Sequence, residues 1–100
     1  MPRRLGITTL QLLAAIRDGE VYGLELVAAT GLPSGTVYPT LGRLRKRGMI
    51  RAAWEDQRIA DREGRPRRRY YELTPAGAVA LADGLDQLQA VTAGLQPREA

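Results

Sequence analysis

The 100-residue chain contains no cysteine and no histidine, and these two absences remove several classes of function at once. Without cysteine there are no disulfides, thiolate metal sites or cysteine nucleophiles. Without histidine the chain lacks the commonest general base and the commonest metal ligand. The sequence also has no glycine-rich phosphate loop and no nucleophile beside a base. We therefore expect neither an enzyme nor a metal or cofactor site.

Long apolar runs are missing as well. No stretch approaches the roughly 20 apolar residues that a membrane-spanning helix needs. Too little apolar sequence follows Met1-Pro2-Arg3-Arg4 for a signal peptide, so we expect a cytoplasmic protein without a membrane partner. With 44% hydrophobic residues in 100, the chain is expected to fold as one domain.

Lysine is nearly absent, whereas arginine is abundant: Lys46 is the only lysine among 15 basic residues. The net charge of +4 favours an acidic partner. Codon bias in a GC-rich genome would explain the preference for arginine, but it does not explain where the arginines cluster. They gather in residues 43–47 and 58–69.

Residues 34–47, SGTVYPTLGRLRKR, are predicted to form a helix with two different surfaces. Val37, Leu41 and Leu44 recur at i, i+4 and i+7 and form one apolar stripe. The opposite surface carries hydroxyl groups and cations and no carboxylate. Ser34 is the expected N-cap. This distribution favours a recognition helix that lies in a groove of DNA.

The alternative for this helix is an ordinary surface helix with a solvated basic face. The missing carboxylates and the position of the helix favour DNA contact instead. For Tyr38, reading a base and donating to a phosphate from a partly buried ring are equally plausible. The predicted DNA contacts of the helix are Ser34, Thr36, Tyr38, Thr40, Arg43, Lys46 and Arg47.

Two helices are expected before it. Residues 21–30 form the second, with Leu24, Val27 and Ala28 facing inward. The tight turn Gly31-Leu32-Pro33 joins it to the recognition helix, so the local unit is a helix–turn–helix.

The first helix is expected to begin at a capping box, with Thr8 as N-cap and Gln11 at N3, and to run to about Asp18. Its leucines and isoleucine cover most of the circumference, which requires burial on more than one side. We expect Leu10 and Leu13 to meet a second subunit there.

Residues 50–55 and 68–73 alternate as two strands of a hairpin, and a polar loop at 56–67 joins them. Arginines at such a tip meet minor-groove or backbone phosphates in winged domains, although a solvated charge run is the alternative. Trp54 is expected to pack in the core under this wing rather than to form a ligand platform. The predicted wing contacts are Arg65, Arg67 and Arg68.

Thr74 and Pro75 begin the last helix as N-cap and N1. Apolar residues then recur by three and four, a heptad seam that favours dimerisation over packing within one subunit. We accordingly divide the chain into a DNA-binding part, residues 1–74, and a dimerisation helix with a frayed tail, residues 75–100. The predicted dimer contacts are Leu10, Leu13, Leu81, Leu85, Leu88 and Leu95.

The resulting architecture is mainly α with a small β-hairpin, a winged helix-turn-helix with a C-terminal dimerisation helix. Tyr22-Gly23, the SGTVYPTL segment and GRPRRRYYELTPAG follow in an order and spacing that resemble the PadR family of bacterial transcriptional regulators. The resemblance covers roughly residues 10–77. It implies a homodimeric repressor on double-stranded DNA, with an unidentified small-molecule effector as a further partner. The alternative is a winged-helix adaptor whose basic face meets an acidic protein.

Overall fold

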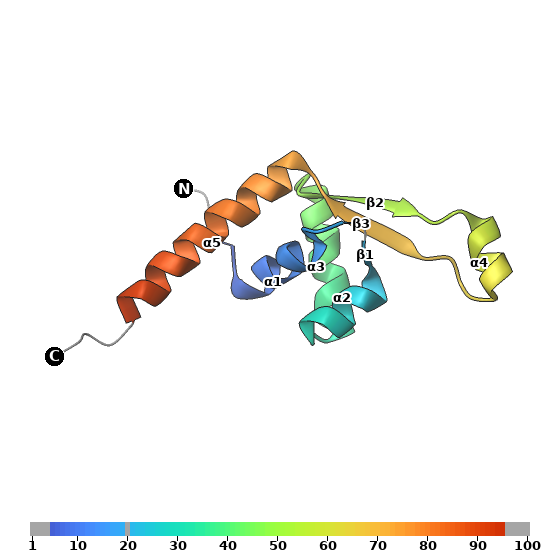
Figure 1. Ribbon diagram of the computed structural model, residues 1–100, viewed down its shortest axis with the longest axis horizontal. Helices are drawn as coiled ribbons and strands as arrows, with labels where there is room; N and C mark the ends of the chain where they lie inside the picture. The colour runs from blue at the N-terminus through green and yellow to red at the C-terminus, as the bar shows by residue number, and fades with distance from the viewer. Residues whose placement is uncertain (1–4, 20, 96–100) are drawn as a thin grey trace.

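A computed structural model describes residues 5–19 and 21–95 of the chain (Figure 1). The fold is mainly helical with one small antiparallel sheet, as predicted. The arginine arm at residues 3–4 and the tail at 96–100 lie outside the described residues. The elements are α1 (Ile7–Ile16), β1 (Val21–Tyr22), α2 (Gly23–Thr30), α3 (Ser34–Lys46), β2 (Ile50–Trp54), α4 (Gln57–Glu63), β3 (Arg69–Leu73) and α5 (Pro75–Leu95).

The core forms around α1, which contacts α2, α3, α5 and β3. Leu12, Leu13 and Ile16 are fully buried in α1. The predicted stripe of α3 is confirmed, because Val37, Leu41 and Leu44 are all buried against this core. The opposite surface of α3 is thereby left to the solvent.

The prediction that α1 meets a second subunit through Leu10 and Leu13 is wrong. Leu10 is 5% exposed and Leu13 is 0% exposed within the single chain. The first half of α5 covers Leu10, which packs under Gly84, whose missing side chain lets the two helices approach; Leu81 of α5 is buried as well. Other elements of the same chain therefore cover the apolar surface of α1. Because Leu81 is buried as well, its prediction as a dimer contact is also wrong.

Two predicted helix starts are also wrong. Helix α1 begins after Gly6 with no side-chain cap and ends at Ile16, so Thr8 is inside the helix rather than its N-cap. Helix α3 has Pro33 as its N-cap, and the Pro33 carbonyl accepts the N–H of Thr36 at 2.9 Å and that of Val37 at 3.0 Å. Ser34 is consequently the first helical residue and is exposed.

The connection from α3 to α5 is tied together by a small set of hydrogen bonds. Gly48 has φ +74°, and the N–H of Met49 donates to the Leu44 carbonyl at 3.0 Å, which ends α3. Thr74 caps α5 as predicted, since its hydroxyl accepts the N–H of Gly77 at 3.0 Å. The same hydroxyl donates to the Gly48 carbonyl at 2.5 Å, and the Thr74 N–H donates to the Met49 carbonyl at 3.1 Å. The start of α5 is thus fixed to the end of α3.

The sheet has the strand order β1-β3-β2, and both pairings are antiparallel. The predicted hairpin is confirmed, with Ile50 opposite Leu73 and Trp54 opposite Arg69. The start of the second helix was predicted incorrectly, because Val21 and Tyr22 pair with β3 as a short strand. Leu24 and Ala28, both expected to face inward, are exposed, whereas Val27 is half-buried and Leu26 is buried.

The predicted polar loop of the hairpin is instead the helix α4, which Figure 1 shows at the tip, far from the C-terminal end of α5. The Asp56 carboxylate accepts the N–H of Arg58 at 2.9 Å and caps this helix. Gly64, with φ +66°, ends it. Ala60 is fully buried in the tip. We call residues 50–73 the wing.

Substitution of Gly77 by alanine should destabilise the fold, because the new Cβ would collide with the carbonyl oxygen of Met49. Since that oxygen belongs to the backbone, relieving the collision requires a shift of α5, and we expect a loss of about 1–3 kcal/mol. The control is Gly94→Ala, whose Cβ enters open space in the same helix and should be neutral or stabilising. Urea unfolding measures both; equal stabilities of the two variants would contradict the close approach.

Candidate nucleic-acid interface

The outer surface of α3 is strongly cationic. Arg43, Arg45, Lys46 and Arg47 are exposed in its last turns, and the described residues of α3 include no carboxylate. Gly31, with φ +69°, ends α2 and begins the turn that sets α3 as the second helix of a helix–turn–helix. The surface that the buried stripe leaves to solvent is therefore suited to a polyanion.

Thr40 is not on this surface, which corrects its prediction as a DNA contact. It is 3% exposed, and its hydroxyl donates to the Thr36 carbonyl at 2.7 Å. The same hydroxyl accepts a hydrogen bond from Nη2 of Arg43 at 3.0 Å. Thr40 thus supports the guanidinium of Arg43 from below. Ser34 and Tyr38 are exposed as expected, and Thr36 is half-buried.

A hollow of about 430 Å³ lies between α3 and the beginning of α1. Arg43, Lys46 and Arg47 line one side of it, and Leu5 and Thr9 line the other. Three cations along one wall make this hollow a natural place for a phosphate-bearing strand.

Tyr38 packs its ring against the start of α2. A Cβ atom on Gly23 would lie 2.6 Å from Cε1 of Tyr38, so the absence of a side chain at Gly23 makes the contact possible. The side chain nevertheless remains 44% exposed. Of the two roles considered for Tyr38, this placement favours the partly buried ring.

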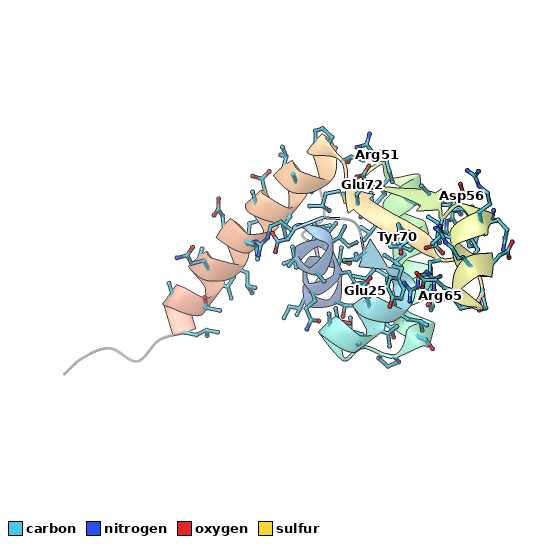
Figure 2. The ribbon with its side chains drawn as sticks, turned by 45° about the vertical axis from the view of Figure 1, so that its right-hand side comes forward. Glu25, Arg51, Asp56, Arg65, Tyr70 and Glu72 are labelled. Carbon is cyan, nitrogen blue, oxygen red and sulfur yellow. The ribbon has the colours of Figure 1, made fainter. Side chains whose placement is uncertain are left out.

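Arg65 has a different role from the one predicted. Its guanidinium forms a bidentate pair with the Glu55 carboxylate, at 2.7 and 3.0 Å, and a third contact with Glu63 at 3.2 Å. The side chains of Arg65 and Glu55 are only 20% and 6% exposed. The ion pair fixes the position of α4 on the hairpin. Because the carboxylates balance its charge, we no longer count Arg65 among the phosphate contacts. Figure 2 shows it at the wing end of the molecule.

The same ion pair changes the acidity of Glu55. Hydrogen bonding from Arg65 lowers the pKa of the Glu55 carboxyl from its ordinary 4.5 to about 2, and the Arg68 N–H adds to the effect at 3.3 Å. Desolvation acts in the opposite direction and is outweighed. The carboxylate therefore stays ionised across the physiological range.

Trp54 is not in the core, which corrects its prediction. It is 55% exposed and lies opposite Arg69 at the end of the pairing of β2 with β3. The guanidinium carbons of Arg67 and Arg69 lie 4.6 and 5.3 Å from its ring centroid. Trp54 is therefore an aromatic support for wing arginines.

Tyr22 supports Arg68 in a similar way, a role that the sequence did not predict. The Arg68 guanidinium carbon lies 4.0 Å from the Tyr22 ring centroid. Tyr70 meets the same ring edge to face, at 5.8 Å and 74°. The motif Tyr22-Gly23 was visible in the sequence, but only the pairing of β1 with β3 places its ring beneath a wing arginine.

A second hollow, of about 400 Å³, separates the wing from the helix–turn–helix. Tyr22 of β1, Leu24 of α2 and Tyr38 of α3 line one side of it, and Trp54 and Arg67 line its wing side. The recognition helix and the wing arginines therefore flank one continuous aromatic and cationic surface.

Several exposed or half-buried apolar side chains lie together on the second half of α5 and beside it, while Leu24 and Val79 are exposed elsewhere on the described surface. Leu85 and Leu88 are half-buried, whereas Val91 is 45% and Leu95 is 77% exposed. Ile7, 63% exposed, lies at a hollow that it shares with Leu88 and Val91. Figure 1 shows this part of α5 extending away from the rest of the fold. None of the described helices is long and apolar enough to cross a membrane.

A helix–turn–helix with a cationic second helix, flanked by an arginine-bearing hairpin, defines a winged helix-turn-helix DNA-binding protein. The chain belongs to the PadR-like family of transcriptional regulators, whose family model matches residues 12–83. Membership in a family of transcriptional regulators agrees with the expectation of a protein that is not an enzyme.

Individual relatives agree with this assignment. The transcriptional regulator Rv3488 of Mycobacterium tuberculosis is 38% identical over 79 residues, which cover 74% of this chain and 68% of the relative. A PadR family regulator from Clostridium difficile R20291 has a TM-score of 0.80 at 20% identity, covering 90% of this chain and 95% of that one. Bacillus subtilis PadR in complex with operator DNA has a TM-score of 0.70 at 22% identity, covering 80% of this chain and 47% of that one.

Arg65→Ala should raise the pKa of Glu55 from about 2 toward its ordinary 4.5, because the hydrogen bonds that favour the carboxylate are lost. A depressed pKa in the folded state means that the pair stabilises the wing above about pH 4.5. This stabilisation disappears as the pH falls toward 2. Carboxyl NMR titration of Glu55 measures the shift, with Arg62→Ala as the control on the exposed side of α4. An unchanged Glu55 pKa in Arg65→Ala would rule out the pair as its cause.

Proposed function

We propose that this PadR-like regulator is a homodimeric repressor that binds a pseudo-palindromic operator. The observation that carries the proposal is the carboxylate-free outer surface of α3, with Arg43, Lys46 and Arg47 exposed in a helix–turn–helix. Such a helix fits the major groove, where arginine reads guanine and hydroxyl groups read several bases. A DNA-binding repressor acts in the cytoplasm, where the bacterial chromosome lies.

In this proposal the contacts divide between bases and phosphates. Arg43 is oriented by Thr40 and is the candidate base reader, whereas Lys46 and Arg47 contact phosphates. The wing adds Arg67 and Arg68 on the flanking backbone. The remaining proposed contacts of α3 are Ser34, Thr36 and Tyr38.

We propose that the dimer forms through the second half of α5. Leu85, Leu88 and Leu95 keep their predicted role, and Val91 and Ile7 join them because they are the large apolar side chains exposed beside the seam. Two recognition helices would then stand one helical turn of DNA apart, about 34–36 Å. The complex of Bacillus subtilis PadR with operator DNA supports DNA as the partner of this fold.

We also propose regulation by a small molecule. A structural neighbour, Bordetella bronchiseptica BpsR, has its DNA binding regulated by 6-hydroxynicotinic acid; its TM-score is 0.74 at 21% identity. In this chain an effector would act by shifting the angle or spacing of the two winged units across the α5 interface.

The test of the proposed function is an electrophoretic shift assay. Purified protein is mixed with the DNA upstream of its own gene, with and without an excess of unrelated competitor DNA. A complex that survives the competitor supports a sequence-specific regulator. Retention of an acidic protein but not of DNA would support the adaptor alternative instead.

Arg43→Ala should relax discrimination at one operator position in each half-site. The expected cost is about 1–3 kcal/mol for the preferred base, because a bidentate arginine–guanine contact is lost. Arg47→Ala is the matched control and should weaken all operator variants alike, since it removes a phosphate contact. Binding of a panel of single-base operator variants measures both. A uniform loss in Arg43→Ala would make Arg43 a phosphate contact.

Val91→Asp should separate the dimer into folded monomers. The substitution places a charge in the proposed interface, while Val91 is 45% exposed in the single chain and lies away from its core. Gln89→Asp, at an exposed position two residues earlier in α5, is the control and should remain dimeric. Light scattering at micromolar concentration measures the mass. A wild-type mass of one chain would exclude the homodimer and the palindromic-operator mechanism with it.

A further inference from the structure

We propose that Tyr22 and Trp54 are positioning residues for DNA binding: their rings hold Arg68 and Arg67 in the conformations from which these arginines reach DNA phosphates. The inference rests on the proposed function, because it assigns the means by which the wing takes part in DNA binding. It concerns residues outside the recognition helix, at the junction of β1 with the wing.

The orientation of Tyr22 is set by the backbone. Tyr22 pairs with Tyr70 in the sheet, and the two rings meet edge to face at 5.8 Å. The ring of Tyr70 thus holds the ring of Tyr22, and the Arg68 guanidinium carbon lies 4.0 Å from the Tyr22 ring centroid. The arginine is half-buried by this arrangement.

Trp54 forms the corresponding support on the other edge strand. It lies opposite Arg69 in the pairing of β2 with β3, and Arg67 precedes Arg69 by two residues. The Arg67 guanidinium carbon lies 4.6 Å from the Trp54 ring centroid. Trp54 is 55% exposed, and its ring provides a broad face for a cation.

The wing uses its arginines in two distinct ways. Carboxylates of the wing pair with three arginines: Glu55 and Glu63 hold Arg65, Asp56 holds Arg58 at 2.8 Å, and Glu72 holds Arg51 at 3.1 Å. An arginine held by a carboxylate is neutralised. One held on an aromatic face keeps its full charge, and its N–H groups, which lie in the guanidinium plane, stay free for a phosphate.

Holding an arginine in place before binding should raise affinity without adding a contact. A free arginine side chain loses rotamer freedom when it docks, and a ring that restricts it beforehand reduces that loss. Removing the ring should therefore weaken DNA binding by about two- to tenfold for each arginine. The number of phosphates neutralised should stay the same.

The residue after Tyr22 links the same junction to the recognition helix. Gly23 leaves room for the ring of Tyr38, which belongs to α3. Tyr22 thereby contacts the wing arginine Arg68, and Gly23 contacts Tyr38 of the recognition helix. This explains physically why the two residue types occur together at this point of the chain.

The test is a double-mutant cycle on DNA binding, measured by fluorescence anisotropy with a labelled duplex of the DNA upstream of the protein's own gene. The variants are Tyr22→Leu, Tyr22→Phe, Arg68→Ala and the double variant Tyr22→Leu/Arg68→Ala, each at several salt concentrations. Thermal unfolding and the emission of Trp54, the only tryptophan, verify that the wing remains folded.

We expect Tyr22→Leu to weaken binding about two- to tenfold with an unchanged salt slope, because Arg68 still reaches its phosphate. Arg68→Ala should lower the magnitude of the slope of log K against log salt by about 0.9, the value for one phosphate. The double variant should bind like Arg68→Ala alone. Tyr22→Phe keeps the ring and should restore most of the affinity that Tyr22→Leu loses.

Two results would overturn the inference while leaving the proposed function intact. One is an equal loss from Tyr22→Leu with and without Arg68, which would make Tyr22 a structural residue only. The other is an unchanged salt slope in Arg68→Ala. Failure of the wild type to bind the duplex would instead refute the proposed function itself.

A second cycle, Trp54→Leu with Arg67→Ala, tests the other pair independently and replaces the first if Tyr22→Leu does not fold. Trp54→Phe is its conservative variant. Non-additive losses that depend on Arg67 support the inference. Additive losses overturn it for this pair.

Discussion

The enclosure of α1 is the constraint on which the rest of the structure depends. This helix is apolar nearly all round, and α2, α3, β3 and the first half of α5 each cover part of it. Because α3 must turn its apolar stripe inward to do so, its cations face outward. Because Leu81 and Gly84 of α5 are buried in covering the same helix, the seam residues that stay accessible to another subunit lie in its second half. The recognition surface and the proposed dimer surface are both consequences of covering one helix.

The wing shows how neighbouring residues of one type take different roles. Arg65, Arg67 and Arg68 are close in sequence, yet the first meets buried Glu55 while the others meet aromatic rings. The ion pair fixes α4 to the hairpin, and its charge is cancelled there. The stacked arginines retain their charge, so they are the members of the cluster that remain available to a polyanion.

Much of the fold could be predicted from local patterns. The period of Val37, Leu41 and Leu44 predicted which side of α3 is buried, and Thr74-Pro75 predicted the start of α5. Local patterns gave the wrong prediction where the same residues fit either of two structures. Residues 57–63 are polar enough for a loop, but the Asp56 cap and buried Ala60 make them a helix.

The sequence by itself determined the helix–turn–helix, the hairpin, the cationic outer surface of α3 and the PadR-like family, because periodicity, caps and charge are local properties. Only the tertiary structure decided that Thr40 and Leu10 are buried, that Trp54 is exposed and that Arg65 is paired. These outcomes depend on which segments meet across the chain. A residue's neighbours along the sequence do not specify its neighbours in space.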